Sequence, residues 1–230
     1  MIAPLNPRIE RMLHDIRLET AESRDWTGIS ALEPKVLDAM RDIPRDAFVA
    51  EEYWPQAYAN HPLPAGFGQT ISQPFIVALM TQMLLPQAGH TMLEIGTGTG
   101  YQSAVLARLV KRLVSIEVIA ELAERARKLL DRLGVNNVEI HHADGYLGYP
   151  EAAPYDGIIV TACAGEIPLP LFGQLKPGAR MVVPVGPPHG AQELMLVEKS
   201  ADGLLSSRSV LPVAFVPLKR EPDKKDSAST

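Results

Sequence analysis

Hydrophobic spacing predicts helices in the first third of the chain. The first helix has an apolar face of residues three or four positions apart: Ile9, Met12, Leu13 and Ile16. Asn6 followed by Pro7 predicts where it begins, because asparagine caps a first turn and proline fits the first helical position. A second helix is expected to begin at Glu33-Pro34 and to end before Pro44. Residues Pro55–Gly68 are rich in proline and glycine and are expected to form a shaped loop.

The middle of the chain alternates short apolar runs with amphipathic stretches. The apolar runs predict strands at Thr91–Ile95, Leu113–Ile116, Val138–His141, Asp156–Val160 and Arg180–Val185. Helical spacing marks the residues from Leu106 to Leu113 and from Leu122 to Leu133, and Gly134 follows as a C-terminal cap. This alternation indicates βαβ units and a parallel sheet. Two last runs, Glu193–Glu198 and Ser209–Leu218, have no helix between them and are expected to add antiparallel strands at one side.

The pattern as a whole predicts an α/β fold. We expect a three-layer Rossmann-like sheet that carries an N-terminal helical extension and antiparallel C-terminal strands. Residues 1–218 are expected to form a single domain, with the extension over 1–70 and the α/β core over 71–218. The segment 219–230 is charged and without periodicity, which is typical of a disordered tail.

Composition narrows the class of protein. With 46% hydrophobic and 21% charged residues among 230, the chain is not largely disordered. The apolar runs around Phe75–Leu85 and Gly157–Ala164 are too short to span a bilayer, and the N-terminus lacks a signal-peptide pattern. The single cysteine, Cys163, excludes an intrachain disulfide and a Cys-rich zinc site. The net charge of −5 argues against a broad nucleic-acid footprint. We therefore expect a cytoplasmic protein that binds no metal, membrane or nucleic acid.

A glycine cluster carries the strongest chemical signal. It is the sequence L-E-I-G-T-G-T-G at Leu93–Gly100, between a predicted strand and a predicted helix. Glycines there allow a tight turn and a close approach of a ligand to the backbone, and the helix N-terminus points at that ligand. Many such clusters are only turns, so the motif alone also fits a structural role.

Acids at two further strand ends favour a ligand. Glu117 ends the second predicted strand, where a carboxylate can accept both hydroxyls of a ribose. Asp144-Gly145 ends the third, where an acid can reach an adenine amino group. Because the carboxyl ends of parallel strands meet at one edge of a sheet, these groups are expected to surround one adenosine-type ligand.

The glycine spacing indicates which adenosine compound binds. The dinucleotide fingerprint is G-x-G-x-x-G, whereas this chain has G-x-G-x-G and Tyr101 at the third fingerprint position. Glu94 precedes the loop and would repel a pyrophosphate but welcome a cation. This pattern resembles the cofactor loop of the S-adenosyl-L-methionine-dependent methyltransferases, whose cofactor carries a sulfonium and no phosphate.

The end of the fourth strand bears on the methyl acceptor. Residues Thr161–Gly165 lack the Asn/Asp-Pro-Pro-aromatic motif of enzymes that methylate amino groups of bases. RNA cytosine-C5 methyltransferases place a nucleophilic cysteine there, after a proline and with a second cysteine. Here Ala162 precedes Cys163 and there is no second cysteine. Cys163 is therefore expected to be a small buried residue, with a thiol nucleophile as the alternative.

The segment before the glycine loop carries a specific resemblance. Ser72 could cap a helix through Phe75–Leu85, with Pro74 in its first turn. The whole segment G-Q-T-I-S-Q-P at Gly68–Pro74, however, resembles the diagnostic motif of the protein-L-isoaspartate (D-aspartate) O-methyltransferase family. Further matches between Gly28 and Leu218 include Pro44-Arg45, H-P-L-P at His61–Pro64, the glycine loop and P-V-G at Pro184–Gly186.

That resemblance implies a function and a set of site residues. The function is transfer of a methyl group from S-adenosyl-L-methionine to the free α-carboxylate of L-isoaspartyl residues in damaged proteins and peptides, leaving S-adenosyl-L-homocysteine. Ser72 matches the active-site serine, and Ser72 and Val216 match substrate positions. The cofactor positions are Thr70, Ile71, Glu94, Gly96, Thr97, Gly98, Gly100, Glu117, Asp144 and Gly145. We expect a monomer. The alternatives are another acceptor, such as RNA, and a non-catalytic adenosine-binding module.

Overall fold

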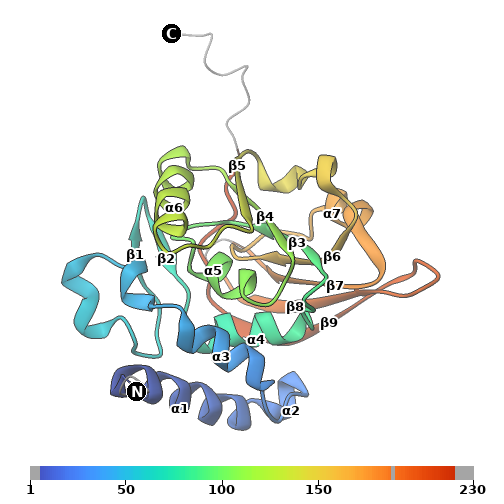
Figure 1. The fold of residues 1–230 in the computed structure, drawn as a ribbon. Coiled ribbons are helices and arrows are strands. Elements are labelled where there is room, and N and C mark those ends of the chain that lie inside the picture. Colours follow the sequence, from blue (N-terminus) through green and yellow to red (C-terminus); the bar gives the residue numbers. More distant parts are fainter. Residues whose placement is uncertain (1–5, 188–189, 221–230) are drawn as a thin grey trace.

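The fold is built on a seven-stranded sheet in the order β5-β4-β3-β6-β7-β8-β9. The computed structural model describes residues 6–187 and 190–220 of the chain (Figure 1). Four strand pairs, β3–β4, β4–β5, β3–β6 and β6–β7, are parallel, and β7–β8 and β8–β9 are antiparallel. The strands are β3 Thr91–Ile95, β4 Arg112–Glu117, β5 Val138–His142, β6 Tyr155–Val160, β7 Leu175–Val185, β8 Gln192–Lys199 and β9 Leu205–Val213. The predicted α/β fold with antiparallel C-terminal strands is confirmed.

The last strand ends earlier than the sequence suggested. The prediction carried it to Leu218, but β9 ends at Val213. The side chain of Gln192 explains the difference: its amide donates to the Phe215 carbonyl at 3.1 Å and accepts from the Phe215 N–H at 2.6 Å. The chain then crosses to Cys163, whose N–H donates to the Val216 carbonyl at 2.8 Å. Residues 214–218 therefore lie at the carboxyl rim of the parallel strands.

The helices around the parallel strands are α5 Tyr101–Ala107, α6 Ala120–Arg132 and α7 Leu169–Gln174. The prediction of a helix from Leu106 to Leu113 was wrong. The Asn137 side-chain amide ends α5 by donating to the Ala107 and Val110 carbonyls at 2.9 and 3.0 Å, and Leu113 belongs to β4. The second predicted helix is confirmed as α6, with Gly134 after it at φ +72°. The six-residue α7 was not predicted.

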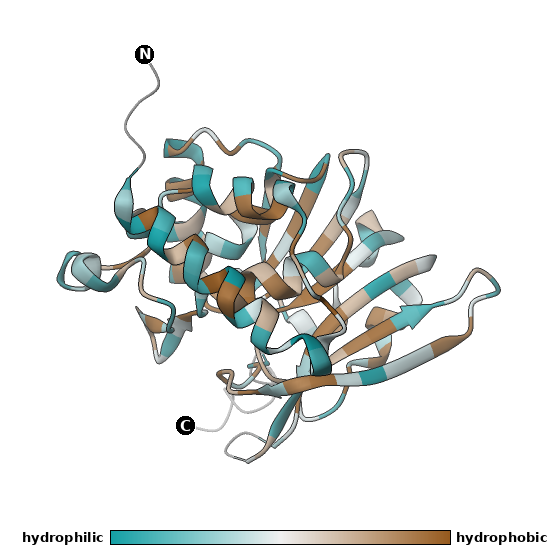
Figure 2. Cartoon of the chain, turned by 90° about the horizontal axis from the view of Figure 1, so that it is seen from below, coloured by the Kyte–Doolittle hydropathy of each residue, from teal (hydrophilic) through white to brown (hydrophobic). Residues whose placement is uncertain are grey.

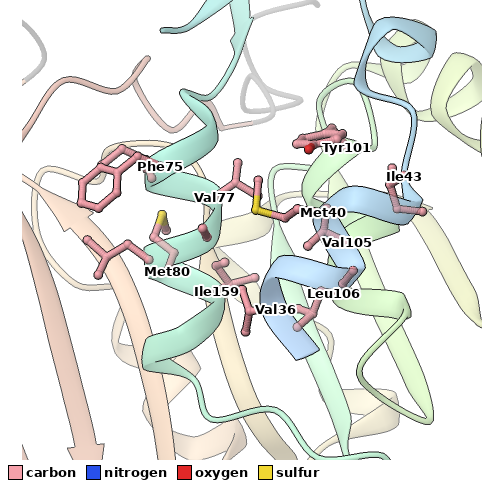
Figure 3. Close-up of a cluster of buried hydrophobic side chains, with 14 of the residues drawn as sticks. Val36, Met40, Ile43, Phe75, Val77, Met80, Tyr101, Val105, Leu106 and Ile159 are labelled. Atoms are coloured by element: carbon pink, nitrogen blue, oxygen red, sulfur yellow. The ribbon is translucent and has the colours of Figure 1, made fainter. Parts of the chain in front are cut away.

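The N-terminal helices pack against the helix that precedes the sheet. They are α1 Pro7–Glu22, α2 Arg24–Thr27, α3 Pro34–Asp42 and α4 Pro74–Met83, with 3-10 turns η1 Arg45–Phe48 and η2 Glu51–Gln56. Asn6 caps α1 as predicted, accepting from the Arg8 N–H at 3.0 Å. Figure 3 shows Met40 of α3, Met80 of α4 and Val105 of α5 in one apolar cluster. The helical extension and the sheet thus share a hydrophobic core.

A hairpin stands where the sequence suggested a loop. Strands β1 Leu63–Gly66 and β2 Gln69–Ile71 pair antiparallel. Gly66, Phe67 and Gly68 turn between them with φ of +87°, +54° and +70°. Glycine adopts such angles without strain, which explains the two glycines. The hairpin carries the diagnostic segment up to α4.

Hydrophilic and hydrophobic positions alternate along the helices of the chain (Figure 2). Within residues 6–187 and 190–220, no helix combines the length and apolar character needed to cross a membrane. Of the tail predicted over 219–230, residues 221–230 lie outside the described residues.

Candidate active site

A cavity opens at the carboxyl rim of the parallel strands. Its walls come from β2 and the residue after it, the loop between β3 and α5, the end of β4, and the segment after β9. Among its lining residues are nine of the positions predicted from the sequence: Thr70, Ile71, Ser72, Gly96, Thr97, Gly98, Glu117, Gly145 and Val216. Tertiary structure therefore brings together segments up to 146 residues apart (Thr70 and Val216).

The backbone of the glycine loop adopts φ angles at which residues with a side chain would be strained. Gly96, Gly98 and Gly100 have φ of +95°, +55° and +88°. A Cβ on Gly96 would lie 2.5 Å from Oγ1 of Thr161, so this position also lacks space for a side chain. The Gly96 N–H donates to the Ile116 carbonyl at 2.8 Å, which ties the loop to the end of β4.

Glu117 connects the end of β4 to the glycine loop. It is 6% exposed and lines the cavity. One carboxylate oxygen accepts from the Gly98 N–H at 2.7 Å, and the other accepts from the Ile119 N–H at 2.9 Å. These bonds fix the carboxylate, and because each oxygen has a second lone pair, both can still accept a ligand hydroxyl.

Ser72 is not a helix cap. Helix α4 begins at Pro74 with Gln73 as the N-cap residue, and no side-chain bond caps it. The capping prediction was wrong because the helix starts one residue later than that role requires. Ser72 is half-buried and lines both the cavity and a neighbouring groove. Within the described ranges its hydroxyl makes no hydrogen bond, so it is available to a ligand.

A buried arginine, Arg45, supports the backbone at Ser72. Arg45 is 0% exposed. Its guanidinium donates to the Ser72 carbonyl at 2.7 Å and to the Ala57 carbonyl at 2.9 Å, and it lies 4.7 Å from the ring centre of Tyr101. Burial lowers the pKa of this guanidinium. The sequence offered Arg45 only as part of the Pro44-Arg45 motif.

Three predicted cofactor positions do not line the cavity. Glu94 is fully buried in β3 and accepts from the hydroxyls of Ser103 and Ser115, the latter at 2.6 Å. Burial raises the pKa of Glu94 to about 7. Gly100 faces α6: a Cβ added to this glycine would lie 3.3 Å from the Cβ of Ala126.

Asp144 is the third of these positions. It accepts from the Tyr146 N–H at 2.9 Å, which caps the short turn after β5. Its other oxygen lies 3.3 Å from Nε of Arg220, whose guanidinium stacks 4.8 Å from the Tyr146 ring centre. The neighbouring Gly145 forms this part of the cavity wall.

Cys163 lies outside the cavity wall. It is 5% exposed, its thiol is 3.4 Å from the Gly186 carbonyl, and burial raises the pKa of the thiol. A cysteine nucleophile needs a thiolate, which these surroundings disfavour. The position fits a small buried residue that supports residues 216–218.

Replacing Cys163 by alanine is therefore expected to leave kcat and the cofactor Kd within about twofold of the wild-type values, because only a weak thiol contact is lost. Steady-state kinetics and cofactor titration check this. A variant without activity but with an unchanged melting temperature would revive the thiol nucleophile.

The charged side chains around the cavity favour a positively charged ligand that carries no phosphate group. Residues 96–100 contain no lysine or arginine, and Glu117 faces the same space. Lys219 is the one cationic side chain among the described lining residues. A pyrophosphate would lack a cationic side-chain partner at the loop and would be repelled by Glu117, whereas a sulfonium compound with ribose hydroxyls fits these donors and acceptors. In the described ranges, no three histidine, cysteine or acidic side chains gather as a metal site.

Comparisons with known proteins agree with this geometry. A family model described as protein-L-isoaspartate(D-aspartate) O-methyltransferase matches residues 25–223. A protein-L-isoaspartate O-methyltransferase 2 of Polaromonas sp. is 52% identical over 207 residues, which are 90% of this chain and 98% of the relative. A protein of the same name from Syntrophobacter fumaroxidans is 51% identical over 90% of this chain and 84% of its own length.

Solved structures show the same similarity. A protein-L-isoaspartate O-methyltransferase superposes with a TM-score of 0.80 at 31% identity, over 92% of this chain and 66% of that one. A putative protein-L-isoaspartate O-methyltransferase from Plasmodium falciparum, solved with S-adenosyl-L-homocysteine, has a TM-score of 0.71 at 22% identity, over 90% and 99%. The second likeness supports the fold alone.

Proposed function

The chain belongs to the protein-L-isoaspartate (D-aspartate) O-methyltransferase family, and on that premise we propose that it methylates L-isoaspartyl residues of damaged proteins and peptides. The methyl donor is S-adenosyl-L-methionine, and S-adenosyl-L-homocysteine is the product. The observation that carries this proposal is the position of Ser72, with a free hydroxyl, where the rim cavity meets a second groove. The two hollows suit a donor and an acceptor that meet at this residue.

The acceptor needs no general base. An isoaspartyl residue presents a free α-carboxylate with a pKa of about 3.3–3.9, so it is ionised at neutral pH. S-Adenosyl-L-methionine, when bound, supplies an electrophilic methyl group. A carboxylate oxygen forms the new bond to carbon as the sulfur–carbon bond breaks and sulfur keeps the electron pair. We propose that the Ser72 hydroxyl donates to the carboxylate and orients it. Holding the carboxylate oxygen, the methyl carbon and the sulfur in line contributes on the order of several kcal/mol in all, and Ser72 supplies part of it.

The reactivity of the methyl ester product accounts for repair of the isoaspartyl linkage. The methoxy group of the ester leaves far more readily than the oxide of an ionised carboxylate. The adjacent backbone nitrogen therefore attacks the ester carbonyl carbon, methanol leaves, and a succinimide closes without the enzyme. Hydrolysis of the succinimide returns part of the chain to a normal aspartyl linkage. Repeated rounds convert the remainder.

We propose roles for the cavity residues toward the cofactor. Glu117 would accept the ribose hydroxyls, and the loop at 96–98 would hold the amino-acid end together with Thr70 and Ile71. Gly145 would lie against the adenine. Glu94 acts indirectly, because Ser115, which donates to it, also pairs with the Thr97 hydroxyl at 2.6 Å. That chain of hydroxyls positions Thr97 in the cavity wall.

Replacing Glu117 by alanine is expected to weaken cofactor binding by about 1–2 kcal/mol, because it removes the ribose acceptor and the partner of the Gly98 N–H. Isothermal titration with S-adenosyl-L-homocysteine measures the change. Glu121→Ala, on the exposed side of α6, is the matched control and should bind like the wild type. An unchanged Kd for Glu117→Ala would contradict its assignment.

A paired-substrate assay tests the function itself. Two peptides that differ only in isoaspartate or aspartate, and an RNA, are incubated with labelled S-adenosyl-L-methionine. Base-labile label on the isoaspartyl peptide alone is the expected result. Label on the RNA would support the alternative acceptor, and binding without transfer would support a non-catalytic module. We also propose that the protein acts as a monomer in the cytoplasm without nucleic acid; sedimentation of the pure protein tests its oligomeric state.

A further inference from the structure

A groove of about 430 Å³ adjoins the cavity. Thr70 and Ser72 line both hollows. The remaining groove wall comes from α1, α4, the residue before β1, the end of β9 and the segment after it. Most of this wall is apolar, with Pro62, Ile76 and residues 211–215. Glu19 of α1 is the one charged side chain among the described residues that line it. A single negative charge therefore stands in an otherwise neutral groove beside Ser72.

The Glu19 carboxylate is held by neutral donors. One oxygen accepts from the side-chain amides of Asn60 at 2.6 Å and Gln73 at 2.9 Å. No ion pair among the described residues includes Glu19. Partial burial is the largest influence on this carboxyl and raises its pKa, as expected for an acid without a cationic partner. Its negative charge is thus fixed in place and not neutralised.

The two amides connect Glu19 to the active-site segment. Gln73 follows Ser72 and is the N-cap residue of α4, and the Asn60 side-chain oxygen accepts from the Phe75 N–H at 3.0 Å. The carboxylate therefore keeps a fixed position relative to Ser72.

We propose that this groove receives the residues flanking the isoaspartyl group, and that Glu19 selects for a lysine or arginine side chain among them. The inference rests on the proposed function. An ammonium or guanidinium group is attracted by a half-buried carboxylate that has no cationic partner, whereas an acidic side chain is repelled by it. The aliphatic stem of the same side chain can lie along Ile76 and Leu211. RNA fits this groove poorly because its phosphates would meet the same negative charge.

Peptide kinetics test the selection. Each isoaspartyl peptide carries lysine, glutamine or glutamate at one flanking position. Four positions are tested in turn, two before the isoaspartate and two after it. The ratio of kcat/KM for lysine over glutamate is measured at low salt. We expect a ratio of about fivefold or more at one position for the wild type, and a ratio near one there for Glu19→Gln. Glu151→Gln, an exposed change before β6 that removes the same charge outside the groove wall, should keep the wild-type ratio.

Two outcomes would overturn the inference: a wild-type ratio near one at all four positions, or a ratio that Glu19→Gln leaves intact. If Glu19→Gln fails to fold, the wild-type enzyme supplies the test. Carbodiimide should couple the flanking lysine to Glu19, found by mass spectrometry, and coupling only to other carboxylates would count against the proposal. The isoaspartyl peptide with glutamine at the flanking position separates the selectivity inference from the proposed function. If the wild-type protein fails to methylate this uncharged peptide, the proposed function is contradicted, and not only the selectivity.

Discussion

Replacing Ser72 by alanine is expected to lower kcat for an isoaspartyl peptide about 10- to 100-fold, while the Kd for S-adenosyl-L-homocysteine stays within about twofold. Ser72 is half-buried, its hydroxyl makes no hydrogen bond to any of the described residues, and it lies where the cavity meets the groove. A hydrogen bond to a charged group contributes about 1.5–3 kcal/mol, which corresponds to that loss. Single-turnover kinetics with saturating cofactor and separate cofactor titration measure the two quantities.

The same variant also tests the capping role. Loss of a serine N-cap costs about 1 kcal/mol of stability. Because Gln73 holds the N-cap position of α4, Ser72→Ala should leave the free energy of unfolding nearly unchanged. Ser207→Ala, on the exposed part of β9, is the matched control. Equal losses of turnover and cofactor affinity, together with lower stability, would show that Ser72 is structural.

Replacing Arg45 by methionine is expected to lower the free energy of unfolding by about 2–4 kcal/mol and to lower kcat as well. The change leaves the carbonyls of Ala57 and Ser72 without their donors, and each unsatisfied buried carbonyl costs about 1–3 kcal/mol. It also releases the backbone of the segment that carries Ser72, and misplacement by about 1 Å can reduce turnover about a hundredfold. Urea denaturation and kinetics at a temperature where the variant stays folded measure both effects.

Two comparisons show whether Arg45 positions Ser72. Arg45→Lys keeps a cation and a donor, so it should recover part of kcat. Arg112→Met removes an exposed arginine that pairs with Glu139, and it should leave kcat unchanged. If Arg45→Met destabilises the protein but its folded fraction turns over like the wild type, the arginine is structural only.

The strands and the glycine loop could be predicted because their signals are local. Apolar runs such as Thr91–Ile95 form strands wherever both faces are covered, and a loop with three positive φ angles demands glycine regardless of its surroundings. The helix proposed at Leu106–Leu113 failed because an apolar turn followed by a strand imitates helical spacing. Periodicity cannot distinguish the two without knowing what covers them.

The sequence by itself determined the α/β class and, through motifs at fixed spacing, the family resemblance; nine of the twelve site positions predicted from it line the cavity. Tertiary structure alone decided that Glu94 lies under the cavity rather than in its wall, and that Arg45 supports Ser72 from 27 residues away. It also brought Glu19 of α1 and the segment after β9 to the two sides of one groove. These outcomes depend on which distant segments bury one another, and burial is a property of the packed chain rather than of any local pattern.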